Sequence, residues 1–148
     1  MEKRYEELLC FGWIDSKPAK LDVERSMLLC GPRSPMSAWS KLNKDRVERL
    51  MALGLMAPQG LAMVALAQKN GRWDALNDVE ALVVPSDLEN QLDAIPGARA
   101  NFEAFPPSAK RGILEWILQA KRPETRQKRV TETATLAAKN VRANQWRP

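Results

Sequence analysis

The fold of this chain is decided largely by one stretch, Ile113-Leu114-Glu115-Trp116-Ile117-Leu118-Gln119-Ala120-Lys121-Arg122-Pro123-Glu124-Thr125-Arg126. Its apolar residues recur three and four positions apart, which is the spacing of a helix with one buried face. Pro123 then ends this helix and begins another, because proline fits the first turn of a helix but not its interior. The second helix is predicted from Glu124 to about Val141, with small apolar residues along one side.

Helical patterns also fill the middle of the chain. Ser37 is placed to cap a helix that Gly54 ends, since serine side chains accept hydrogen bonds from the first turn and glycine favours a helix end. Residues 58–69 are apolar all round, which is typical of a central, buried helix. Ser86 and Glu89 have the spacing of a capping box at the start of a further short helix.

The N-terminal part shows a different pattern. A short helix is predicted for residues 2–11, followed by strands at Trp13–Ile14 and Val23–Cys30 with a turn around Ser16–Pro18. We therefore predict an α+β fold, predominantly α-helical, with a short N-terminal helix and a β-hairpin packed on a bundle of about five helices. Residues 1–148 are predicted to form a single domain, divided into residues 1–36 (helix plus hairpin), 37–143 (helical part) and 144–148 (flexible tail).

Several kinds of chemistry are excluded by the composition. The chain has no histidine, which rules out Ser-His-Asp and Cys-His catalysis and histidine-ligated metal sites. No pair of carboxylates suggests acid–base catalysis, and a lone acid such as Asp15 is a poor catalyst. We predict a non-enzymatic protein with no catalytic residues, no cofactor and no metal.

The cysteines and the apolar runs indicate the compartment. Cys10 and Cys30 lie among apolar neighbours, which favours two buried thiols in a reducing compartment, with a Cys10–Cys30 disulfide as the alternative. The charged N-terminus lacks a signal-peptide core. The longest apolar run, Leu61 to Ala67, is far below the roughly 20 residues of a membrane span. A cytoplasmic location without a transmembrane segment is predicted.

Positive charge is concentrated towards the C-terminus. Ten of the 23 Lys and Arg residues fall in residues 109–148, against three acids there. Such polarity favours anionic partners. Three arginines (Arg122, Arg126 and Arg129) have a spacing that places them on one helical face next to Lys121. They form either a phosphate-binding stripe or a solvated face paired with nearby acids.

The loop and helix start between Pro32 and Asn43 form the most distinctive local feature. One interpretation is an anion or peptide site in which helix N–H groups act together with two cations and two hydroxyls, those of Arg33, Lys41, Ser37 and Ser40. The other is a capped helix start at which Trp39 packs into the core and Arg33 is solvated.

Four segments, in this order, carry a resemblance to a known family. They are Leu9-Cys10-Phe11-Gly12-Trp13-Ile14-Asp15, then Pro32-Arg33-Ser34-Pro35-Met36-Ser37-Ala38-Trp39-Ser40-Lys41-Leu42-Asn43, then Gly71-Arg72-Trp73, and finally Ala120-Lys121-Arg122-Pro123-Glu124-Thr125-Arg126. Together they resemble the bacterial YdeI/OmpD-associated, or bacteriocin-protection, family from about residue 5 to about residue 140. Ser34 and Met36 stand where the family has basic residues.

The resemblance implies a biological role but no reaction mechanism. Its names point to tolerance of bacteriocins or other antimicrobial peptides and to a protein partner related to a porin, and they carry no catalytic residues with them. Members of the family usually have further β-strands before the Phe-Gly-Trp-Ile-Asp segment. This chain starts just ahead of that segment, so we expect its sheet to have an open edge that invites pairing into a homodimer.

The leading hypothesis is a non-enzymatic, cytoplasmic bacterial stress protein for antimicrobial-peptide tolerance. It would bind a protein partner or an anionic ligand through two surfaces, which together comprise Arg33, Ser37, Trp39, Ser40, Lys41, Lys121, Arg122, Arg126 and Arg129. The alternative is a nucleic-acid-binding module that uses the basic C-terminal helices. An enzyme with an unfamiliar site is the third hypothesis.

Overall fold

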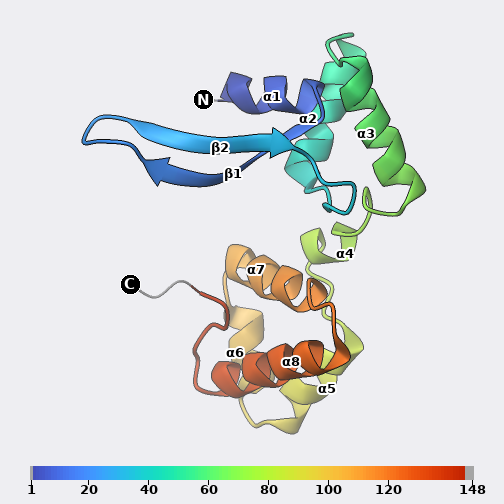
Figure 1. The fold of residues 1–148 in the computed structure, drawn as a ribbon. Coiled ribbons are helices and arrows are strands. Elements are labelled where there is room, and N and C mark those ends of the chain that lie inside the picture. Colours follow the sequence, from blue (N-terminus) through green and yellow to red (C-terminus); the bar gives the residue numbers. More distant parts are fainter. Residues whose placement is uncertain (1, 146–148) are drawn as a thin grey trace. The chain divides into compact units, whose positions relative to one another are not determined.

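The structure is a computed structural model that describes residues 2–145, with only the backbone at Glu2. Its residues group into two compact units, which we call the N-terminal unit (Met1–Leu76) and the C-terminal unit (Asn77–Pro148) (Figure 1). Each unit is described by itself. The single domain over residues 1–148 stays a prediction, and residues 146–148 of the predicted tail lie outside the described residues.

The N-terminal unit contains three helices and a β-hairpin. In chain order they are α1 (Glu2–Cys10), β1 (Trp13–Lys20), β2 (Ser26–Pro32), α2 (Lys41–Ala52) and α3 (Pro58–Lys69). The predicted N-terminal helix and the hairpin are confirmed. The position of the turn was wrong: it lies at residues 21–25, where the Asp22 Oδ1 accepts the backbone N–H groups of Glu24 and Arg25. The segment predicted as the turn instead contains a register shift between Asp15 and Pro18.

A small core holds the helices of this unit together. It comprises Leu9, Cys10, Trp39, Val47, Leu50, Val64 and Ala67, with Met56 and Trp73 packed against it. The prediction that α3 is buried all round was wrong. Only Gly60, Val64 and Ala67 of α3 are buried, whereas Leu61 and Leu66 are 41% and 37% exposed. One face of α3 meets α1 and the core, and Leu61 and Leu66 lie outside that face.

The start of α2 also differs from the prediction. Ser40, and not Ser37, is the N-cap, and its hydroxyl accepts the backbone N–H of Asn43. The backbone N–H of Ser37 donates to the carbonyl of Ser34. Ser37 therefore belongs to a turn that precedes the helix, and α2 begins at Lys41.

Over residues 77–145 the regular elements of the C-terminal unit are all helices. Its elements are α4 (Asn77–Glu80), α5 (Ser86–Ala94), α6 (Ala98–Ala104), α7 (Pro107–Leu118) and α8 (Pro123–Ala138). Helix α8 packs against α5, α6 and α7, and its buried side is formed by Val130, Thr133, Ala134 and Ala137. The helix ends three residues before Val141 because Asn140 adopts a left-handed φ of 55°. The backbone N–H of Asn140 then donates to Ala137.

The predicted capping box on α5 is not formed. The N-cap is Pro85, which has no side-chain hydrogen bond to offer, and its carbonyl accepts the N–H groups of Leu88 and Glu89. The neighbouring Asp87 carboxylate accepts the N–H of Leu88 and also two bonds from Arg126. The helix therefore begins one residue earlier than predicted, so Ser86 lies inside it and does not cap it.

The predicted class, α+β and predominantly helical, is confirmed. Across residues 2–145 the only sheet is the two-stranded antiparallel hairpin. Seven helical segments follow it, and one of them, α4, has four residues. Over the same residues, no helix combines the length and the apolarity that a membrane crossing needs.

Candidate functional site

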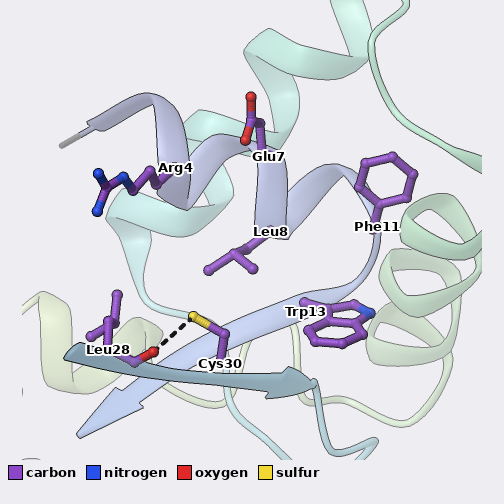
Figure 2. Close-up of a pocket in the computed structure, with 7 residues that line it drawn as sticks. All are labelled: Arg4, Glu7, Leu8, Phe11, Trp13, Leu28 and Cys30. Carbon is purple, nitrogen blue, oxygen red and sulfur yellow. Dashed lines mark hydrogen bonds between the residues drawn. The ribbon is translucent and has the colours of Figure 1, made fainter. Parts of the chain in front are cut away.

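An open groove of about 760 Å³ lies on the N-terminal unit between α1 and the hairpin (Figure 2). Leu8 points from α1 towards Leu28 and Cys30 of β2, and Phe11 and Trp13 lie at one end, where α1 leads into β1. The remaining lining residues are Arg4 and Glu7, both on α1. The groove is therefore mainly apolar, with one charge of each sign.

Alternate residues of β2 form the floor of this groove. Side chains alternate between the two faces of a strand, so Leu28 and Cys30 line the groove and are half-buried, whereas Met27 and Leu29 are 47% and 65% exposed. The antiparallel register places Cys30 opposite Asp15. Gly12, with a φ of 72°, allows the sharp change of direction from helix to strand.

Two aromatic side chains at the end of the groove remain accessible. Phe11 is 58% and Trp13 is 42% exposed. Our sequence analysis missed them as site residues. The available signal was the placement of two large aromatics on either side of a glycine between a helix and a strand, where neither belongs to a helical apolar stripe.

Arg33, a predicted ligand-binding residue, is buried. The residue is 4% exposed, and its guanidinium carbon lies 3.8 Å from the centre of the Trp39 ring. Nη2 donates to the carbonyl of Ala38 at 2.5 Å, and Nε and Nη1 are buried without a hydrogen-bond partner. Burial lowers the pKa of Arg33 to about 10. The expectation that Arg33 is solvated was therefore wrong.

The other predicted residues of the Pro32–Asn43 junction are also engaged within the chain. Trp39 is 1% exposed and stacks at a tilt on Trp73, with ring centres 5.2 Å apart, so its predicted place in the core is confirmed. The Ser40 hydroxyl caps α2, and Lys41 pairs with Asp45 at 2.9 Å. Ser37 is half-buried. The structure thus brings these residues together around a helix start rather than around an open pocket.

Replacing Arg33 by methionine is expected to leave the free energy of unfolding within about 1 kcal/mol of wild type, or to raise it. A buried cation without an ion partner is costly, and an apolar side chain of similar volume retains the packing. Arg33→Ala is the matched control. It is expected to cost about 2 kcal/mol or more, because it leaves a cavity beside the Trp39 ring.

Urea unfolding of the two Arg33 variants, followed by tryptophan fluorescence, measures both quantities. Losses of equal size in the methionine and alanine variants would contradict this expectation. They would show that the hydrogen bond to Ala38 matters more than the volume of the side chain.

In the basic C-terminal segment, two of the three predicted stripe arginines make internal contacts. Arg126 pairs with Asp87 at 2.6 Å, and its hydrogen bonds lower the pKa of that carboxyl. Arg129 donates to the carbonyl of Trp116, and its guanidinium lies 4.9 Å from the centre of that ring. Lys121, Arg122 and Lys128 are exposed. These contacts join α8 to α5 and α7, and Lys121, Arg122 and Lys128 stay exposed to a ligand.

The two cysteines are free thiols in the structure. Cys10 is buried, and its thiol pKa is raised by burial and by the nearby Glu6 and Glu7. The Cys30 Sγ donates to the carbonyl of Leu28 at 3.6 Å. In the part of the chain that the structure describes, no three Cys, Asp or Glu side chains are grouped so that they could hold a metal ion.

Comparisons with known proteins find matches to two parts of the chain. Residues 81–140 match the family described as bacteriocin-protection, YdeI or OmpD-associated, and residues 1–63 match a family described as a domain of unknown function. A curated relative, the uncharacterized protein YdeI of Bacillus subtilis (strain 168), is 39% identical over 63 residues. The match covers 43% of this chain and 32% of the relative. No solved structure matches the chain.

Proposed function

We propose that this chain, whose residues 81–140 are a domain of the bacteriocin-protection, YdeI or OmpD-associated family, is a non-enzymatic bacterial protein of antimicrobial-peptide tolerance. It acts by binding the apolar face of a peptide in the groove between α1 and the hairpin. The observation that carries this proposal is the groove itself, with Phe11 and Trp13 accessible at one end.

The size and lining of the groove suit apolar side chains. Its volume of about 760 Å³ falls within the roughly 300–1,000 Å³ of typical ligand pockets. That is room for several side chains of a peptide rather than for the whole peptide. Aromatic residues carry much of the affinity at binding surfaces, and burying one large apolar side chain is worth about 1.5–3 kcal/mol.

The charges near the groove favour an amphipathic peptide over a simple anion. Arg4 and Glu7 place opposite charges on the same helix, so the groove has no excess of positive charge with which to hold an anion. The cations proposed for an anionic ligand at the junction are a buried Arg33 and a Lys41 paired with Asp45. Cationic antimicrobial peptides present an apolar face, which is the part that this groove would cover.

The test is a titration with a fluorescently labelled, 20-residue Leu/Lys peptide designed as an amphipathic helix. A peptide of the same composition, shuffled to remove the apolar face, is the ligand control. Phe11→Ser is expected to weaken binding at least tenfold, in line with the loss of one buried apolar side chain. Leu55→Ser is the matched protein control, because Leu55 and Phe11 are each 58% exposed and Leu55 does not line the groove.

Fluorescence anisotropy gives the dissociation constants. Equal affinities for Phe11→Ser and Leu55→Ser would exclude the groove as the site. Equal affinities for the amphipathic and the shuffled peptide would show that charge alone drives the association. In cells, expression of the wild-type chain is expected to raise survival in a cationic peptide antibiotic, and Phe11→Ser is expected to remove that gain.

Nucleic-acid binding is the second candidate, and the excess of positive charge in residues 109–148 favours it. Of the predicted basic cluster it would use the exposed Lys121, Arg122 and Lys128, since Arg126 and Arg129 have internal partners. Micromolar binding to generic DNA that weakens steeply with salt, and that is lost in the triple alanine variant of these three residues, would support it. A protein partner related to a porin stays a prediction.

A further inference from the structure

We infer that the free edge of β2 pairs with the β2 strand of a second copy of this chain, so that two hairpins form one four-stranded antiparallel sheet. Among the residues that the structure describes, the hairpin is a two-stranded sheet in which β2 pairs with β1 alone. A sheet edge with unpaired backbone groups is a template for another strand, and two-stranded sheets gain stability from added strands.

The two edges of the hairpin differ in a way that selects β2. Strand β1 contains Pro18, which has no N–H to donate, and a register irregularity between Asp15 and Pro18. It also carries Lys17 and Lys20. Proline, irregular register and lysine are the features with which proteins block edge pairing. Strand β1 is therefore a protected edge.

Strand β2 has none of these protections along most of its length. From Met27 to Gly31 it is uncharged and contains no proline, and Pro32 follows only at its end. Met27 and Leu29 remain 47% and 65% exposed. A neighbouring strand would cover part of these side chains and satisfy the outward backbone groups of β2.

A second copy is the occupant that this edge fits. Antiparallel pairing of a strand with itself has two-fold symmetry, so the same apolar segment supplies both sides of the contact. No charges face each other near the axis, because Met27–Gly31 has none. Pairing through β1 would instead have to accommodate Pro18 and the register irregularity beside it.

The contact is small, and this determines the expected affinity. The area that one strand edge with two exposed apolar side chains can bury is well below the roughly 800 Å² per partner of a standard interface. The dimer is therefore expected to dissociate in the micromolar range and to depend on concentration.

Sedimentation velocity over about 1–200 µM tests this inference. The wild type is expected to shift from its 16.7 kDa monomer to twice that mass as concentration rises. Leu29→Lys is expected to weaken the dimer at least tenfold. Leu53→Lys is the matched control, because Leu53 is 63% exposed but lies outside the hairpin, and it is expected to dimerise as the wild type does. Far-UV circular dichroism verifies that both variants fold.

Hydrogen exchange locates the contact. Amides of residues 27–31 are expected to gain protection with concentration in the wild type, but not in Leu29→Lys, while those of β1 remain unchanged. A monomer at every concentration would overturn the inference, and so would a dimer that leaves exchange in β2 unchanged or that Leu29→Lys does not weaken. Phe11 lies outside both strands, so the Phe11→Ser variant is expected to retain the dimer. A failure of peptide binding and a failure of strand pairing are therefore distinguishable.

Discussion

Replacing Gly60 by alanine is expected to destabilise the N-terminal unit by about 3 kcal/mol, the upper end of the usual cost of overpacking. A Cβ on Gly60 would lie 2.2 Å from the Cys10 carbonyl oxygen, 2.8 Å from its carbonyl carbon and 2.9 Å from the Leu9 oxygen. All three are backbone atoms, which cannot rotate away as a side chain can. Helix α3 would have to move off the end of α1, and the core between them would open.

Gly112→Ala is the matched control for Gly60→Ala. Gly112 lies inside α7, and a Cβ there would meet nothing within 4 Å. Alanine in a helix interior is expected to stabilise by roughly 0.5–1 kcal/mol relative to glycine. Native-state hydrogen exchange measures the effect in each unit separately. A loss below about 1 kcal/mol for Gly60→Ala would contradict the close approach of α1 and α3.

Replacing Trp39 by alanine is expected to cost about 3–5 kcal/mol, as large aromatic truncations in cores do. Trp39 is 1% exposed and belongs to the core of the N-terminal unit. It packs against Trp73 and also underlies the Arg33 guanidinium. The substitution removes the ring from both contacts and leaves the buried cation facing a cavity.

Trp116→Ala tests whether the burial of Trp39, and not its stacked arginine, explains this cost. Trp116 also lies under an arginine, Arg129, but it is only half-buried. Because less apolar area is lost, Trp116→Ala is expected to cost less than Trp39→Ala. Urea unfolding by circular dichroism gives both values. Equal losses would contradict the assignment of Trp39 to the core.

Several features of this protein could be predicted because their causes lie within a few residues. Repeating apolar positions and Pro123 indicated α7 and α8, and both helices are present within two or three residues of the expected ends. The predicted N-terminal helix and the hairpin were also confirmed, although the turn lies further along the chain. Four segments together pointed to a family whose model matches residues 81–140, which contain the last of these segments.

The candidate site depended on contacts between residues far apart in the sequence. The groove exists because α1 lies beside the hairpin, so that Leu8 points towards Leu28 and Cys30, with Phe11 at one end. The same holds for the cations that our sequence analysis assigned to ligands. Arg126 meets Asp87, 39 positions away, and Arg33 is buried beside Trp39, whose ring packs on the distant Trp73.

Local sequence therefore determined most of the helices and the presence of the hairpin, since backbone hydrogen bonds and side-chain periodicity act over one or two turns of chain. The tertiary structure decided which faces are covered. Leu61 and Leu66 of α3 are as apolar as Val64, yet only Val64 is buried, because only its side of the helix packs on the core. Burial depends on what the rest of the chain places opposite a residue, and that information is spread over the whole sequence.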